Sequence, residues 1–266
     1  MNSFRVFLNL VQRDLKVLKK RALSIFFDNV VLLFANVILF GYLLPAMGMS
    51  KNLIGPLFVG YVVMAFFEIG FSLSFKIVDD IKFNRFIDYQ LTLPISTKGL
   101  LAQYTANFAI EAGLITLPLL TCGILLLGDK FVIVQTNWLA FSCMYMLSLI
   151  LFGLLFLFCS FYYRYKWFFH NIWPRRLEPL FLFGAVFVTW KKLYAFSHIL
   201  GVAYLFNPMT YATEGIRATL IGGNDFLPVL PCMIGVTFFI VVTWFLLVSA
   251  VQKKLDLVVP QKKSCS

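Results

Sequence analysis

Long apolar stretches alternate with short polar ones along almost the whole chain. The apolar stretches cover residues 25–47, 54–75, 100–127, 138–163, 177–190 and 227–251. A helix needs about 20 apolar residues to cross the hydrocarbon core of a bilayer, which is about 30 Å thick. The pattern therefore predicts an all-α integral membrane protein, in which six spans form a single domain over residues 1–266.

The fifth apolar stretch, residues 177–190, is the shortest of the six. A helix of that length extends only about 21 Å, which is less than the thickness of the core. Lys191 and Lys192 follow it directly. We therefore expect either that the helix continues past these lysines or that the chain departs from a simple span here.

Residues 1–22 have a different periodicity. Apolar residues recur at intervals of three and four, and basic residues lie mostly between them; the apolar positions are Phe4, Phe7, Val11, Leu15 and Leu18. This pattern is typical of an amphipathic helix that lies on a membrane surface. We predict such an interfacial helix, leading into the first span. The alternative is an ordinary solvated leader.

The segment at residues 191–224 contains a helix that is too short to span a bilayer. Asn207 is a good N-cap residue, Pro208 suits the first helical position, and Gly222 is suited to the end. An apolar stretch, residues 197–206, precedes this helix. We predict two re-entrant half-helices that enter the outer leaflet and return. A surface loop with one helix is the alternative.

The net charge of +11 comes from residues that lie between the apolar stretches. Eighteen of the 23 Lys and Arg residues fall in the N-terminal arm, residues 76–98, residues 164–176 and the C-terminal tail. Cytoplasmic connections carry such an excess. The charge pattern thus predicts that both termini are cytoplasmic, and it removes the need for a nucleic-acid partner.

The sequence lacks the motifs by which an ATP-binding protein, a serine hydrolase or a zinc enzyme within the membrane would be identified. There is no phosphate loop of the form G-x-x-x-x-G-K-[ST] and no G-x-S-x-G motif. His170 and His198 are far apart and belong to no H-E-x-x-H pattern. We therefore expect no catalytic residue, no metal site and no cofactor in this chain.

Glu68 is the polar residue that stands out within the second span. A carboxylate among Phe66, Phe67 and Phe71 is costly in lipid unless it is neutral, paired or facing a watery cavity. Glu68 is therefore a candidate for a transport path. Alternatively, the helix ends early and Glu68 reaches the cytoplasmic interface.

The connection at residues 76–98 carries charges of both signs and then the sequence LTLPISTK. A short helix broken at Pro94 would present mixed charge to a soluble partner. Taken alone, this stretch is also compatible with an ordinary solvated loop.

Two segments resemble motifs of the ABC-2 type permeases of ABC transporters. Residues 91–101, LTLPISTKGLL, are similar to the family's L-x-x-x-P-I-S stretch between spans two and three. Residues 207–217, NPMTYATEGIR, are similar to its N-P-hydrophobic-T-Y…E-x-x-R segment between spans five and six. Both lie at the expected places, so the resemblance covers nearly the whole length. Within the family, the residues of the second motif are most similar to those of the drug, lipooligosaccharide and polysaccharide exporters.

The resemblance implies that two permease subunits pair and that each docks a cytoplasmic ATPase, which binds ATP and Mg. The residues implied in coupling to the ATPase are Asp88, Gln90, Leu91, Pro94, Ile95, Ser96 and Lys98. Those implied in an external gate are Asn207, Pro208, Thr210, Tyr211, Glu214 and Arg217. Glu214 and Arg217, three positions apart on a helix, can pair there.

The expected function is the permease subunit of an exporter in a bacterial inner membrane. Its substrate would be an amphiphilic, lipid-linked or drug-like molecule moved out of the cytoplasm or inner leaflet. The alternatives are an ion- or proton-coupled secondary transporter that uses Glu68 and a membrane scaffold that transports nothing. The sequence leaves open the cargo, and whether the pair is a homodimer, which we expect, or a heterodimer.

Overall fold

The structure is a computed structural model that describes residues 3–48, 50–84, 89–90, 94–131, 133–134, 136–163 and 171–258. Those residues contain helices and no strand, which confirms the all-helical prediction for them. The main helices are α1 Ser3–Ile38, α2 Leu44–Ala46, α3 Ile54–Asp79, α5 Thr97–Leu127, α6 Trp138–Tyr162, α8 Glu178–Leu182, α9 Trp190–Phe196, α10 His198–Tyr204, α11 Pro208–Leu220 and α12 Val229–Val258. Single π-helical turns lie at Leu39–Leu43, Asp80–Asn84 and Trp173–Leu177.

Four of the described helices are long and apolar enough to cross a membrane. They cover Ile54–Phe83, Thr97–Leu127, Trp138–Tyr162 and Val229–Lys253, and correspond to the second, third, fourth and sixth predicted stretches. Side-chain caps set two of their starts, because Ser96 Oγ accepts from Gly99 N and Asn137 Oδ1 accepts from Ala140 N. Of the first predicted stretch, Val30–Ala46 forms a shorter apolar helix.

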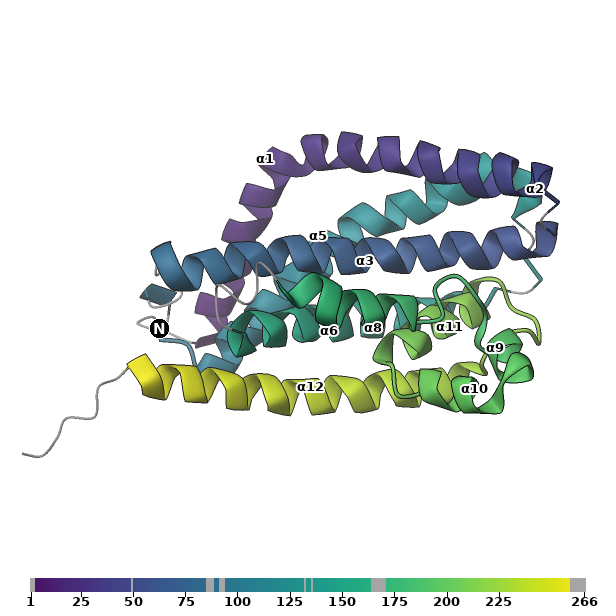
Figure 1. Ribbon diagram of the computed structural model, residues 1–266. Coiled ribbons are helices and arrows are strands. Elements are labelled where there is room, and N and C mark those ends of the chain that lie inside the picture. Colours follow the sequence, from purple (N-terminus) through teal and green to yellow (C-terminus); the bar gives the residue numbers. More distant parts are fainter. Residues whose placement is uncertain are drawn as a thin grey trace, which may run out of the picture.

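The long helices lie side by side along one axis (Figure 1). α6 packs against α3, α5 and α12, so it occupies the middle of the bundle. α1 starts low at one end, bends, and then runs along the outside, where it packs against α5. The end of the bundle where α1 begins and α12 ends is called the terminal end. The opposite end, which holds α9, α10 and α11, is the α11 end.

Aromatic side chains fill the core between α3, α6 and the helical segment at residues 171–182. The Phe67 ring lies 5.0 Å from Phe156, 5.9 Å from Trp173 and 6.1 Å from Phe181, measured between centroids. Tilted and edge-on aromatic pairs at these distances add to the burial of apolar area. The contacts fix the segment at residues 171–182 against α3.

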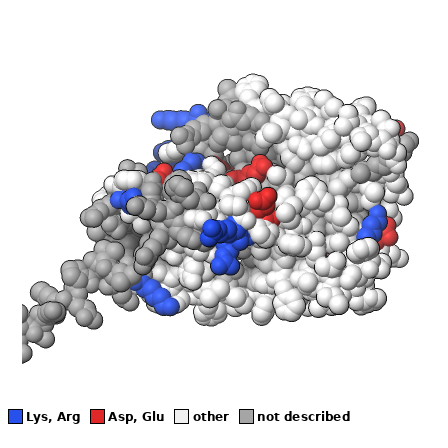
Figure 2. Space-filling view, viewed as in Figure 1, with Lys and Arg blue, Asp and Glu red and all other residues white. Residues whose placement is uncertain are grey.

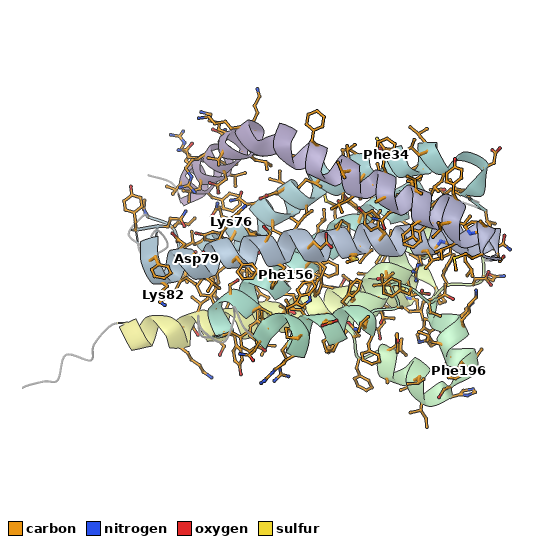
Figure 3. The ribbon with its side chains drawn as sticks, turned by 45° about the horizontal axis from the view of Figure 1, so that its top comes forward. Phe34, Lys76, Asp79, Lys82, Phe156 and Phe196 are labelled. Carbon is orange, nitrogen blue, oxygen red and sulfur yellow. The ribbon has the colours of Figure 1, made fainter. Side chains whose placement is uncertain are left out.

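The outer surface of the bundle is largely apolar, with charge gathered towards its ends. Figure 2 shows a broad uncharged surface, charged atoms mostly in the half nearer the terminal end, and a small second group at the α11 end. In Figure 3, Lys76, Asp79 and Lys82 lie towards the terminal end of α3, whereas Phe196 lies at the opposite end of the molecule. Exposed residues such as Leu125, Leu139 and Phe238 suit contact with lipid.

No single helix covers residues 177–190, so the predicted fifth span is wrong as bounded, and the alternative that the chain departs from a simple span here is the one that the structure shows. α8 ends at Leu182, the chain turns through residues 183–188, and α9 begins at Trp190. Ala185 has a φ of 54°, which an L residue seldom adopts. The cause lies elsewhere in the sequence, since the buried Arg217 side chain binds the carbonyl groups of Ala185 and Val186. The helix that precedes this turn includes residues 171–182.

Residues 76–84 also differ from the predicted loop. α3 continues to Asp79 and a π-helical turn follows to Asn84. Ile77 and Val78 are buried, so the inward face of α3 goes on packing beyond the predicted end of the span.

Candidate functional site

Helix α11, the predicted gate helix, begins and ends where the sequence indicates. The Asn207 side-chain oxygen accepts a hydrogen bond from Met209 N at 2.9 Å, and its amide donates to the Leu180 carbonyl at 2.6 Å. Pro208 takes the first helical position. Gly222, with a φ of 75°, follows the end of the helix. Asn207 therefore both caps α11 and attaches it to α8.

α11 is short but deeply packed. Ten of its 13 residues are buried, and it contacts α3, α6 and α12. Thr210 donates a hydrogen bond to the Tyr204 carbonyl at 2.8 Å. The Tyr211 ring lies over Gly235 of α12, where an added Cβ would be 2.4 Å from the ring. The helix is thus held on several sides.

Glu214 and Arg217 form an ion pair at 3.0 Å in which both side chains are fully buried. This confirms the predicted contact between them. Arg217 also donates from Nε to the Pro56 carbonyl at 2.9 Å, and from its Nη atoms to the carbonyls of Ala185 and Val186. These are the bonds that a guanidinium with five N–H donors can make.

The second oxygen of Glu214 accepts a hydrogen bond from Leu227 N at 3.1 Å, just before α12. Through the pair, α11 is bonded to the start of α3, the turn at residues 183–188 and the entry to α12. Burial lowers the pKa of Arg217, and Glu214 opposes that shift. Arginine remains charged in proteins. A buried ion pair adds little net stability, because removing both charges from water costs free energy, but its bonds fix the orientation of α11.

Gly60 provides the space for this network. An added Cβ at Gly60 would lie 2.1 Å from the Val186 carbonyl oxygen and 3.0 Å from an Nη atom of Arg217. The close approach of α3 to the turn therefore requires glycine.

Glu68 presents the opposite arrangement. Its side chain is exposed on α3, and within the described part of the chain it has no hydrogen bond or ion pair. α3 continues 11 residues beyond it to Asp79, so the alternative that the helix ends early at Glu68 is wrong. Glu68 borders a cavity of about 300 Å³ whose other lining residues are Phe71, Ser72, Phe75 and Trp173.

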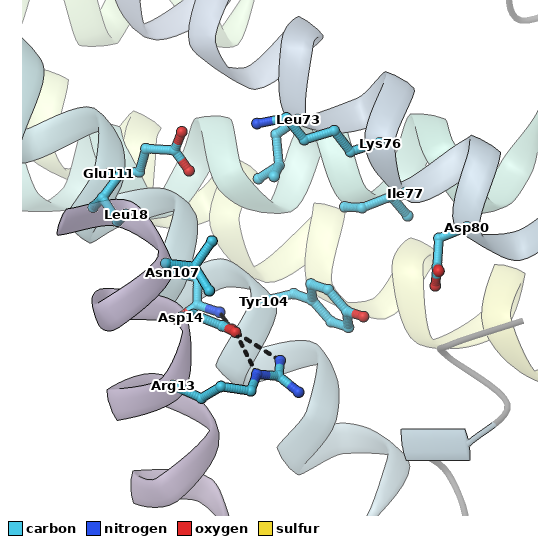
Figure 4. A pocket seen from close by; sticks show the side chains of 11 residues that line it. Arg13, Asp14, Leu18, Leu73, Lys76, Ile77, Asp80, Tyr104, Asn107 and Glu111 are labelled. Atoms are coloured by element: carbon cyan, nitrogen blue, oxygen red, sulfur yellow. Dashed lines mark hydrogen bonds and ion pairs between the residues drawn. The ribbon is translucent and has the colours of Figure 1, made fainter. Parts of the chain in front are cut away.

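A charged pocket of about 340 Å³ opens at the terminal end between α1, α3 and α5 (Figure 4). Asp14 of α1 accepts hydrogen bonds from Gln103 Nε2 at 2.7 Å and from the Asn107 amide of α5. Arg13 pairs with the same carboxylate at 2.6 Å. The other charged lining residues are Lys76, Asp80 and Glu111.

Sequence reasoning did not identify this pocket, although signals for it exist. Gln103, Asn107 and Glu111 recur every four residues along an otherwise apolar span, which is the spacing of one helix face. Asp14 follows Val6 and Leu10 at the same spacing, and these two are the buried residues among positions 5–20. The predicted stripe of Phe7, Val11, Leu15 and Leu18 is at least partly accessible.

The predicted coupling segment is joined to α5. Gln90 is buried, and its side-chain oxygen accepts from Tyr104 OH at 2.5 Å. Ser96 caps α5, while Pro94 and Lys98 are exposed and Ile95 is half-buried. Asp88 and Leu91 lie outside the described residues. Tyr104 also lines the charged pocket, so the segment and the pocket share a wall.

The structure does not bring the three predicted sites together. The coupling segment lies at the terminal end, α11 lies at the other end, and Glu68 lies between them on α3. Among the described residues, no three His, Cys, Asp or Glu side chains are grouped so that they could hold a metal ion.

Comparison of the chain with known family models, with curated proteins and with solved structures finds no match.

Proposed function

We propose that this chain is the permease subunit of an ABC-type exporter in a bacterial inner membrane. It moves an amphiphilic, lipid-linked or drug-like molecule outward, and a separate cytoplasmic ATPase supplies the energy. Two permease copies form the path. Both termini are cytoplasmic, and the terminal end faces the ATPase. The first of six spans runs through α1 and α2, the fifth includes residues 171–182, and α9 to α11 return into the outer leaflet.

The placement of the two segments that resemble family motifs carries this proposal. The segment around Gln90 and Ser96 is bonded to the start of α5 at the terminal end. α11, which holds Glu214 and Arg217, packs among α3, α6 and α12 at the other end. A docking surface and a gate are needed at opposite ends of a transport path.

Continuous helices connect these two ends mechanically. α5 extends for 31 residues, about 47 Å, from the Ser96 cap to the α11 end. Two nucleotide states of an ATPase can shift a membrane equilibrium only through different contacts at such a joint. Movement of the segment at residues 89–98 would displace α5, and through α6 it would reach α11.

A proton- or ion-coupled secondary transporter remains the second candidate, because Glu68 exposes a carboxylate near the middle of α3. This reading needs no ATPase. A scaffold that transports nothing would leave ATP turnover by any partner unchanged when Asp88 or Pro94 is altered.

The test is to purify the full chain in mild detergent from its native membrane and identify its partners by mass spectrometry. The proposal expects a stoichiometric ATPase with a Walker phosphate loop. Lys98→Gln should weaken its association, whereas Lys192→Gln, the same change at the α11 end, should not. A chain that is active alone would overturn the proposal and favour Glu68-dependent ion coupling.

A further inference from the structure

The cavity beside Glu68 combines one carboxylate with three aromatic rings. Phe71 lies 4.4 Å from Phe75 and 4.8 Å from Trp173, measured between ring centroids. All three residues line the cavity with Glu68 and Ser72. We propose that this cavity binds the head group of an organic ammonium ion, so that the exported cargo is an amphiphilic cation. This inference names the substrate class and so rests on the proposed function.

The position of Glu68 favours an occupant that carries a positive charge. Glu68 lies 14 residues from the start of α3 and 11 from its end, near the middle of an apolar helix. A carboxylate at such a depth is costly unless something compensates it. The described residues supply no hydrogen bond or ion pair to it. A cation carried by the ligand compensates this charge directly.

The aromatic rings select an organic cation over a metal ion. Aromatic faces attract quaternary ammonium groups through their quadrupoles, and cages of several rings are the usual form of such sites. Hard metal cations need about six oxygen ligands, whereas only Glu68 and Ser72 offer side-chain oxygens here. An anion would be repelled by Glu68. The cavity, about 300 Å³, is shallow and open, which suits a head group whose tail stays outside it.

The charged pocket at the terminal end lacks this selectivity. Its Asp14 carboxylate already accepts hydrogen bonds from Arg13, Gln103 and Asn107. Positive and negative groups both line it. Within the described residues, the Glu68 cavity is a site where a carboxylate without a hydrogen bond or ion pair lies beside three aromatic rings and no cationic side chain.

The experiment measures binding of octyltrimethylammonium to the full chain in nanodiscs of zwitterionic lipid, by equilibrium dialysis against empty nanodiscs. Octyl sulfate and octanol are the matched anion and neutral compound. We expect saturable binding of the cation alone. Glu68→Gln should weaken it by about tenfold or more, and Glu68→Asp by less. Trp173→Leu should weaken it further than Trp173→Phe, because phenylalanine keeps a ring.

Glu111→Gln is the control variant, since it removes a carboxylate from another apolar helix. It should bind the cation as the unaltered chain does. Equal binding by Glu68→Gln, equal binding of octyl sulfate, or no saturable binding would each overturn the inference. So would a proton-driven flux that needs Glu68 while ammonium binding does not.

Failure of the inference can be separated from failure of the proposed function. An ATPase that copurifies with a chain unable to bind the ammonium ion leaves the exporter standing and removes its cationic cargo. Saturable, Glu68-dependent binding by a chain that has no ATPase partner keeps the site and removes the exporter.

Discussion

Two carboxylates in the helices of this protein, Glu214 on α11 and Glu68 on α3, have opposite surroundings. Glu214 is fully buried and bonded to Arg217 and to Leu227 N. Glu68 is exposed on its helix and has no hydrogen bond or ion pair within the described residues. The first is committed to holding the protein together, and the second is free to interact with something outside it. The two carboxylates therefore differ both in exposure and in the number of groups bonded to them.

The largest expected effect, and the strictest test of the contrast between Glu214 and Glu68, comes from removing the partner of Glu214. Arg217→Met leaves a buried carboxylate unpaired and three backbone carbonyls without their donor. We expect the free energy of unfolding to fall by about 3–5 kcal/mol. Denaturant unfolding in detergent, monitored by far-UV circular dichroism, measures this.

The matched control is the double variant Glu214→Gln with Arg217→Met, which removes both charges. It should recover part of the lost stability, because no unpaired ion remains. A single variant as stable as the unaltered chain would show that the pair does not hold α11.

The next effect concerns the space that the pair needs. Gly60→Ala places a Cβ 2.1 Å from the Val186 carbonyl oxygen, so the turn or α3 must move. We expect a loss of about 1–3 kcal/mol from overpacking, seen as a lower temperature of half-unfolding. Gly113→Ala is the control, since its Cβ would meet Leu149 at an ordinary 3.5 Å. Similar behaviour of the two variants would argue against a tight contact at Gly60.

How far the sequence predicts this region depends on how local each feature is. The Asn207 cap, the start of α11 at Pro208 and the contact between Glu214 and Arg217 all depend on neighbours along the chain, and they are confirmed. The short length of residues 177–190 indicated either a longer helix or a departure from a simple span there. The position of the break after Leu182 was not predictable from local sequence, because it depends on Arg217, more than 30 residues away.

For the long helices, too, local features were predictable from the sequence and contacts between distant residues were not. Four predicted spans are confirmed as apolar helices because length and hydropathy suffice to identify them. The bonds between Asp14, Gln103 and Asn107 join α1 to α5 across a long separation in sequence. Only the three-dimensional arrangement brings these residues together. The exposure of Glu68 also required the structure, because it depends on which face of α3 meets α6.

A smaller effect is expected at the start of α11. Asn207→Ala removes a cap to Met209 N and a bond to the Leu180 carbonyl. The loss should be about 1 kcal/mol, measured as the shift of the thermal midpoint in the same detergent. Ser142→Ala, which removes an exposed side-chain bond to the Trp138 carbonyl in α6, serves as the control. An equal shift in both variants would contradict a specific role for the cap.

The smallest effect on folding should come from Glu68→Gln. No bond from Glu68 to a described residue is lost, so the free energy of unfolding should change by no more than about 0.5 kcal/mol. Glu214→Gln, the same change at the buried site, should cost clearly more. The same unfolding measurement compares them. A large loss for Glu68→Gln would mean that this carboxylate is structural and would erase the contrast between the two.

If α1 provides the first span, as we propose, its unbroken course would make the protein responsive to bilayer thickness. At 36 residues α1 is about 54 Å long, well beyond a hydrocarbon core of about 30 Å, and it bends where its arm turns along the bundle (Figure 1). A thicker or thinner membrane shifts how much of this helix lies in lipid. Because Asp14 binds Gln103 and Asn107, such a shift pulls on α5. Lipid chain length would then act on α5, the helix that the proposed coupling segment also contacts.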